Sequence, residues 1–200
     1  MDSLFWNGKQ RKSDYVNLCY QRCGWNLQTV TEMKTERLYL RTLTEADANI
    51  VRDFNKGEFK TEEAALEWIR WVKNKNDEGR LIVNFYIWIA QTNQYIGRVY
   101  IHSKPELGGE VEIGYGISEE HRNKGYATEA AEAIVQFAFK KAGQDVLVAI
   151  VKPENIASRR VIEKLGFTKH GVRRVPDENG IDCEFDYFRL CRNDWLLLVK

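Results

Sequence analysis

The segment 109-GEVEIGYGISEEHRNKGYATEAAEAIV-135 joins two different periodic patterns through a basic turn. In its first half the apolar residues alternate with Glu112, Gly114 and Gly116, which predicts a strand with two unlike faces. From Tyr126 onward the apolar residues recur at helical spacing, which predicts an amphipathic helix. A strand, a turn and a helix in this order begin a βαβ unit.

The basic turn is unusual for its position. Arg122 and Lys124 come just before a helix amino terminus, where a cation opposes the positive end of the helix dipole. An anion bound between them would make the arrangement favourable, and Gly125 would allow a phosphate to approach the backbone N–H groups closely. The alternative is a solvated basic turn.

Two well-known phosphate motifs are absent from the sequence. The run GYGISE, which begins at Gly114, lacks the third glycine of the dinucleotide fingerprint, and no Gly-x4-Gly-Lys-Ser/Thr occurs. A different phosphate-containing ligand is therefore expected.

The patterns on either side of this segment predict a mixed α/β (α+β) protein. Two helix signals follow a strand near Leu38, and the strand patterns at 81–90, 94–103 and 109–118 predict an antiparallel meander. The helix at Tyr126 is followed by a strand pattern at 145–153 and a helix pattern at 155–167. Two terminal strands are then expected on either side of 176–180. The sheet should be partly parallel.

Composition limits the classes of function. The chain has 200 residues with 30 Lys plus Arg against 29 acids, so the net charge of +1 gives no global field for nucleic acid or an anionic membrane. It has neither an apolar run long enough to span a bilayer nor a signal-peptide pattern, which predicts a cytoplasmic protein. Its four cysteines have spacings typical of neither a disulfide framework nor a zinc site, so no metal is expected: Cys19, Cys23, Cys183 and Cys191.

Residues 1–32 form an extension of unknown role. They lack a clear period, and the strand-like alternation starts near Met33. The extension could be an extra helix, an arm of a homodimer, or a start extended too far ahead of Met33.

Three motifs carry a family resemblance. Arg-x-x-Gly-x-Ala, Arg122 to Ala127, resembles the acetyl-coenzyme A pyrophosphate loop of the GNAT superfamily of N-acetyltransferases. The run NIASRRVIEKLGF from Asn155 resembles the second cofactor motif of the superfamily. TERLYLRTLTEADA, from Thr35, resembles the opening of the ribosomal-protein alanine/serine N-terminal acetyltransferase branch.

The resemblance implies a fold and a set of cofactor contacts. Residues 33–200 should form one GNAT-like domain, with a largely antiparallel sheet of about seven strands flanked by about four helices. Two parallel strands should splay open around acetyl-CoA, the co-substrate. The residues implied in binding it are Ile117, Ser118, Arg122, Asn123, Lys124, Gly125, Tyr126, Ala127, Thr128 and Asn155.

Acetyl transfer needs a neutral amine, a polarised thioester carbonyl and a proton for the leaving thiolate. Glu112 is the candidate base, because it lies beside two glycines on the strand face that should be open to a substrate. The alternative is an ordinary exposed strand residue. A backbone N–H near Ile117 could polarise the carbonyl.

The proton donor is harder to identify. Many members of the superfamily have a tyrosine seven residues after the motif asparagine, but here that position holds Ile162. The resemblance implies Ser158 as the group that serves the thiol. Its alternative role is to help cap the helix begun by Asn155.

Several kinds of amine are candidate acceptors. An α-amine, with a pKa of about 8, needs less help to become neutral than a lysine amine. The branch resemblance favours a protein amino terminus over an aminoglycoside or a polyamine. A rival is a non-catalytic CoA-binding regulatory module. Acids in the first two helices and the terminal hairpin weakly favour a cationic amine, although solvated faces explain them equally well: Glu45, Asp47, Asp53, Glu58, Glu62, Glu63, Asp177 and Glu178.

Overall fold

The computed structural model describes residues 31–54, 59–77, 81–176 and 180–199. Almost all of the predicted extension 1–32 lies outside these residues, as do Cys19, Cys23, Glu58, Asp177 and Glu178. The described part begins one residue before the first strand.

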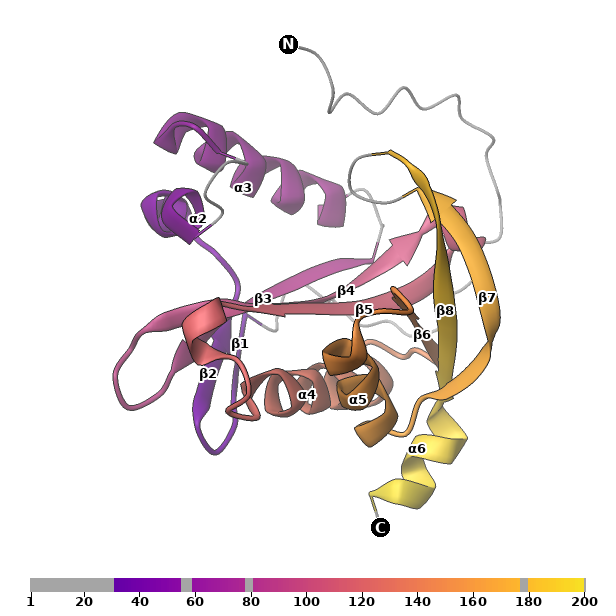
Figure 1. Ribbon diagram of the computed structural model, residues 1–200. Coiled ribbons are helices and arrows are strands. Elements are labelled where there is room, and N and C mark those ends of the chain that lie inside the picture. Colours follow the sequence, from indigo (N-terminus) through magenta and orange to yellow (C-terminus); the bar gives the residue numbers. More distant parts are fainter. Residues whose placement is uncertain (1–30, 55–58, 78–80, 177–179, 200) are drawn as a thin grey trace.

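A single sheet of eight strands runs through the molecule in the order β1-β2-β3-β4-β5-β6-β8-β7 (Figure 1). All neighbours are antiparallel except β5 and β6, so the predicted meander and the central parallel pair are confirmed. The strands are β1 Glu32–Lys34, β2 Leu38–Arg41, β3 Ile82–Ile89, β4 Tyr95–Lys104, β5 Glu110–Ile117, β6 Val146–Val151, β7 Thr168–Pro176 and β8 Asp182–Cys191.

Helices cover both faces of the sheet. In Figure 1, α2 (Ala48–Phe54) and α3 (Glu62–Asp77) lie above it, and α4 (Tyr126–Lys140) and α5 (Ile156–Lys164) lie below. A further helix, α6 (Arg192–Leu198), ends the described chain. In the part that the structure describes, no helix is long and apolar enough to cross a membrane.

Two elements exceed the expectation of about seven strands and four helices. β1 has only three residues, too few to show an alternation in the sequence. α6 has seven residues and is held to the core by Trp195, whose ring lies 5.3 Å from that of Phe139. Both elements depend on their neighbours rather than on a periodic pattern of their own.

The helix α4 packs on the sheet through a stripe of small and aliphatic residues. Ala130, Ala131 and Ile134 are fully buried, and the alanines let the helix axis come close to the strands. Phe137 of α4 meets Phe85 of β3 edge to face, with ring centroids 5.7 Å apart. The main core therefore lies between α4 and the sheet.

The strand β5 keeps its alternation along its whole length. Its register with β4 runs without a shift from Gly97↔Ile117 to Lys104↔Glu110, so no bulge changes the direction of the side chains. Val111 and Ile113 belong to the core beneath, and Glu112 and Gly114 lie on the opposite face.

The two parallel strands part soon after they meet. In the described chain β5 and β6 share one register pair, Glu112↔Val148, while β5 stays paired with β4 as far as Ile117. The predicted opening is therefore confirmed, and Glu112 lies where it begins.

Candidate active site

The basic loop connects β5 to α4 through two left-handed residues. Asn123 has φ 60° and Gly125, which precedes the helix, has φ 82°. Among the described residues no side chain caps α4, so the N–H groups of its first turn are left for another acceptor. This arrangement suits an anion at the helix amino terminus.

A third cation, Arg37, lies against this loop from the turn between β1 and β2. Its Nε lies 2.7 Å from Glu129 Oε2, and its Nη1 donates to the Lys124 carbonyl oxygen at 2.9 Å. The guanidinium also lies 4.8 Å from the centre of the Tyr126 ring. A Cβ at position 125 would lie 3.2 Å from Arg37 Nη2, so glycine leaves room for this arginine as well as for a ligand.

Glu129 is the anchor of this arrangement. Besides the Arg37 side chain, it accepts the Arg37 backbone N–H at 2.8 Å and the Thr35 hydroxyl at 2.5 Å. Burial opposes the charge, but these three donors together hold the pKa of Glu129 below its usual range. No periodic pattern in the sequence indicates the pair of Arg37 and Glu129, because 92 residues separate them.

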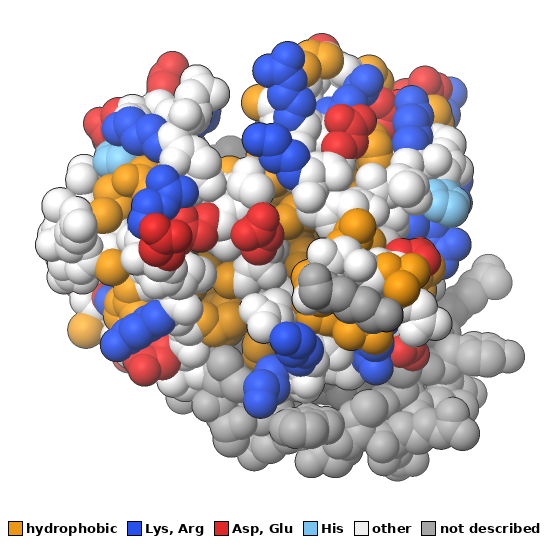
Figure 2. Space-filling model, turned by 90° about the horizontal axis from the view of Figure 1, so that it is seen from below, with side chains coloured by type: hydrophobic (Ala, Val, Ile, Leu, Met, Phe, Trp, Pro, Cys, Tyr) orange, Lys and Arg blue, Asp and Glu red, His pale blue; other side chains and the backbone are white. Residues whose placement is uncertain are grey.

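The charges near the loop are local rather than part of a broad field. Figure 2 views the molecule from the side of α4 and α5 and shows Lys and Arg side chains interspersed with Asp and Glu. This mixture agrees with the net charge of +1. An anion would therefore be attracted by the loop itself.

The residues between β5 and the loop are already engaged in part. The Ser118 N–H donates to the Ile96 carbonyl at 2.8 Å, so this N–H is used by the sheet. Because successive strand residues direct their backbone groups to opposite edges, those of Ile117 face the opening. The Ile117 carbonyl accepts Arg122 Nε at 3.2 Å.

A cavity of about 140 Å³ occupies the gap between the splayed strands. Glu112 lines it, and only 6% of this residue is exposed, so it is not the ordinary exposed strand residue of the alternative interpretation. The complete lining is Tyr100, Glu112, Ile113, Gly114, Tyr115, Ala149, Ile150, Val151, Ser158 and Ile162.

Burial makes Glu112 a stronger base than an exposed carboxylate. Loss of solvent raises its pKa, and the nearby Lys104 ammonium, 3.3 Å from Oε2, partly offsets the rise. The pair is poorly aligned, and Oε2 has no hydrogen bond of good geometry within the described residues. A carboxyl with a raised pKa suits proton transfer near neutral pH.

Two aromatic residues of β4 flank the carboxylate. Tyr100 and His102 stack with ring centroids 4.4 Å apart, and burial lowers the pKa of His102 to about 3, which keeps it neutral. The Tyr100 ring passes over Gly114, where a Cβ would lie 2.1 Å from Tyr100 Cζ. Glycine is therefore required at position 114 for this packing.

The start of α5 forms the other wall of the cavity. The Asn155 side chain accepts the Ser158 N–H at 3.0 Å, so Asn155 does cap this helix. Ser158 lines the cavity, and Ile162, one turn further on, is buried against it. The structure thus brings the two predicted catalytic residues, Glu112 and Ser158, to one cavity.

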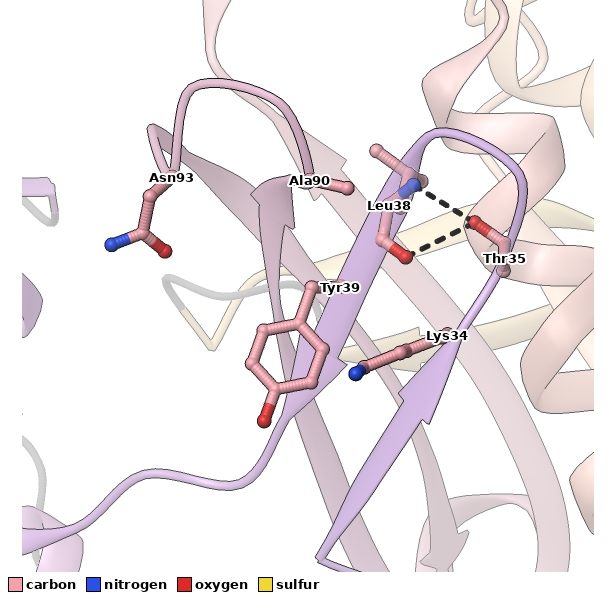
Figure 3. A pocket seen from close by; sticks show the side chains of 6 residues that line it. All are labelled: Lys34, Thr35, Leu38, Tyr39, Ala90 and Asn93. Carbon is pink, nitrogen blue, oxygen red and sulfur yellow. Dashed lines mark hydrogen bonds between the residues drawn. The ribbon is translucent and has the colours of Figure 1, made fainter.

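A larger cavity of about 460 Å³ lies apart from the splayed strands (Figure 3). It is open at the edge of the sheet, where Thr35 bonds both backbone groups of Leu38. Its lining contains no carboxylate and no residue of β5 or β6: Lys34, Thr35, Leu38, Tyr39, Ala90 and Asn93. It lacks the groups that acetyl transfer needs.

Several acids expected to favour a cationic acceptor are paired with arginines. Asp47 lies 2.7 Å from Arg41, and Glu45 lies 2.8 Å from Arg70. Arg52 lies 2.7 Å from Asp53. These pairs offset the charge of three of the five acids in that set that the structure describes.

A sheet splayed at one parallel pair, with a phosphate-type loop at the following helix and a buried carboxylate in the gap, defines an N-acetyltransferase of the GNAT type. The sequence profile of the family described as acetyltransferase (GNAT) domain matches residues 37–168. The chain therefore belongs to the GNAT acetyltransferase family, whose members use acetyl-CoA as co-substrate.

Relatives agree with this assignment. The uncharacterized N-acetyltransferase YnaD of Bacillus subtilis is 31% identical over 154 residues, which cover 75% of this chain and 85% of YnaD. The ribosomal-protein-S5-alanine acetyltransferase of Vibrio fischeri superposes with a TM-score of 0.69 at 18% identity, over 82% of this chain and 98% of that one. Mutant forms of the spermidine/spermine N-acetyltransferase SpeG of Vibrio cholerae superpose with a TM-score of 0.66 at 17% identity, over 83% of this chain and 100% of that one. At these identities the two structures establish the fold alone.

Proposed function

We propose that this N-acetyltransferase acetylates a protein N-terminal α-amine, with Glu112 as the base. The observation that carries the proposal is the position of Glu112, a buried carboxylate with a raised pKa at the point where β5 and β6 part. An amine entering from the glycine side of β5 would meet the carboxylate beside the cavity.

The pyrophosphate of acetyl-CoA fits the loop that precedes α4. Arg122, Lys124 and Arg37 supply positive charge, and the uncapped first turn of α4, from Tyr126 through Ala127 to Thr128, supplies N–H donors. Asn123 and Gly125 give the loop its left-handed turns. The pantetheine arm would then extend along Ile117 toward Asn155 and the cavity.

The chemistry proceeds by direct attack of the amine on the thioester. Glu112 accepts the amine proton, directly or through water, and the Ile117 N–H is suited to polarise the carbonyl. Ser158 lies on the opposite wall of the same cavity, where the thiol would leave.

An α-amine is the acceptor that asks least of this site. At pH 7 an α-amino group is about one-tenth neutral, whereas deprotonating a lysine-type amine costs about 4.6 kcal/mol. A polyamine carries several lysine-type amines, and most of the described acids that could attract one are paired with arginines. SpeG makes a polyamine the second candidate. The cytoplasmic location and a homodimer stay predictions.

An acceptor screen tests the proposal. Peptides that begin with alanine or serine are compared with spermidine and with an aminoglycoside, in the presence of acetyl-CoA and with Glu112→Gln as the control. We expect turnover of the peptides that depends on Glu112. Turnover of spermidine or the aminoglycoside alone would reject the protein α-amine as the acceptor. Binding of acetyl-CoA without turnover of any amine would favour a non-catalytic regulatory module.

A further inference from the structure

The cavity between the strands has two sides with different chemistry. Because side chains alternate along β5, Glu112 and Tyr115 lie on opposite faces of the sheet. Glu112 is on the face away from α4, and Tyr115 packs against the core that contains α4. Both residues line the same cavity.

Acetyl transfer needs both sides. The amine and its base occupy one side of the thioester carbonyl, and the sulfur occupies the side from which acetyl-CoA enters. The loop at Arg122 and the start of α5 place that entrance on the α4 face. A proton donor for the thiolate should therefore lie on the face of Tyr115 rather than on that of Glu112.

Among the described residues that line the cavity, three side chains carry a hydroxyl: Tyr100, Tyr115 and Ser158. Tyr100 passes over Gly114 next to Glu112, on the amine side. Ile162, which is 1% exposed, contributes only hydrocarbon from α5. Tyr115 and Ser158 are thus the donors on the sulfur side.

The Tyr115 phenol is held across the gap by a hydrogen bond. Its hydroxyl, carried by β5, donates to the Ser158 carbonyl oxygen of α5 at 3.0 Å. Beyond Glu112 the two strands have no register pair in the described chain, so this contact ties together the walls that the pantetheine arm must pass between.

We propose that Tyr115 is the residue that protonates the departing thiolate of coenzyme A, a role for which α5 offers no acidic side chain at Ile162. The inference rests on the acetyl transfer proposed above. Ser158 then acts mainly through its backbone, as the acceptor that holds the phenol in place when no cofactor is bound.

The amine nitrogen bonds to the carbonyl carbon, the C–S bond breaks, and its electron pair stays on sulfur. Glu112 takes the amine proton, and the Tyr115 hydroxyl hydrogen passes to sulfur. Solvent returns one proton to the phenolate and removes one from Glu112. Burial raises the pKa of Tyr115 to about 12, which keeps the phenol protonated at neutral pH.

The first test is Tyr115→Phe, which removes one hydroxyl and keeps the ring. We expect kcat with acetyl-CoA to fall about 100-fold, while the Kd for acetyl-CoA changes less than about threefold. The loss should be much smaller with an acetyl thioester of an aryl thiol, because a more acidic thiol leaves without a proton. Tyr39→Phe is the matched control, since Tyr39 lies on β2, outside the gap.

A second variant separates chemistry from packing. Tyr115→Phe combined with Ile162→Tyr supplies a phenol to the same cavity from α5, and we expect it to recover at least about tenfold in kcat. Both thioesters are measured with the same protein, so a loss of folded enzyme lowers both rates equally and their ratio still tests the role if Tyr115→Phe melts early.

Two results would overturn the inference. One is a Tyr115→Phe kcat within about threefold of the parent; the other is an equal loss with both thioesters and no rescue by Ile162→Tyr. Failure of the parent to acetylate any amine would instead reject the function on which the inference rests.

Discussion

At the scale of single residues, Glu112 illustrates what a strand pattern can and cannot reveal. Alternation along β5 indicated which face carries the carboxylate, and the unbroken register with β4 agrees. The sequence did not reveal its burial or its neighbour Lys104. That contact depends on which residues of two strands become neighbours, and only the register determines this.

Replacing Glu112 by glutamine tests its role as base. We expect kcat/KM to fall at least about 100-fold while acetyl-CoA still binds, and the acidic limb of the pH profile to disappear. In the parent, activity should fall as pH drops through the raised pKa of Glu112, because the protonated acid cannot accept a proton. An unchanged pH profile in the variant would remove Glu112 from the mechanism.

The same substitution has a consequence for stability. A buried carboxyl whose pKa is raised on folding contributes its full stability below its unfolded pKa, and that contribution is lost as pH rises through the folded value. Glutamine has no charge to bury. The melting temperature of Glu112→Gln at neutral pH should therefore equal or exceed that of the parent, as differential scanning calorimetry would measure.

Lys104 should set the pH at which Glu112 works. Its ammonium lowers the pKa of a carboxyl that burial raises, so Lys104→Met is expected to move the acidic limb of the kcat/KM profile to higher pH. Lys104→Arg keeps the charge and is the control. A limb that stays in place in the methionine variant would show that Lys104 does not act on the base.

At the scale of elements, the long periodic segments were predictable and the short ones were not. The helix α4 and strands β3 to β6 followed from spacing alone, since each buries one face. The strand β1 and the helix α6 have three and seven residues and rely on tertiary contacts. The loop before α4 was predicted as an anion site. The support that Arg37 gives this loop from the turn between β1 and β2 was not predicted.

That support predicts a role for Arg37 in cofactor binding. Arg37→Ala removes a positive charge beside the loop and frees Glu129 to repel a phosphate, so we expect the Kd for acetyl-CoA to rise about tenfold or more. Because the Arg37 side chain is 44% exposed, the ion pair itself should add little to stability. Isothermal titration calorimetry measures the affinity.

A control separates the loop from charge in general. Arg52→Ala also removes one cation, but this residue pairs with Asp53 on α2, on the other face of the sheet. The affinity of the Arg52→Ala variant for acetyl-CoA should match that of the parent. Equal weakening by both substitutions would mean that Arg37 acts only through net charge.

At the scale of the whole molecule, charge pairing limits what composition can say about the acceptor. The acids in and around α2 and α3 were expected to favour a cationic amine weakly, but Arg41, Arg52 and Arg70 offset the acids they touch. A sequence does not show which charged side chains form ion pairs, so an electrostatic field inferred from composition ignores this pairing. The two cofactor motifs were more informative, because one gives a loop geometry that suits a phosphate and the other caps a helix.

We propose that acetyl-CoA binds at the loop before α4 and enters the gap between β5 and β6. Calorimetric titration with acetyl-CoA, of the parent and of Arg122→Ala combined with Lys124→Ala, tests it most directly. We expect micromolar binding by the parent and its loss in the double variant. No binding by the parent, or equal binding by both proteins, would contradict it.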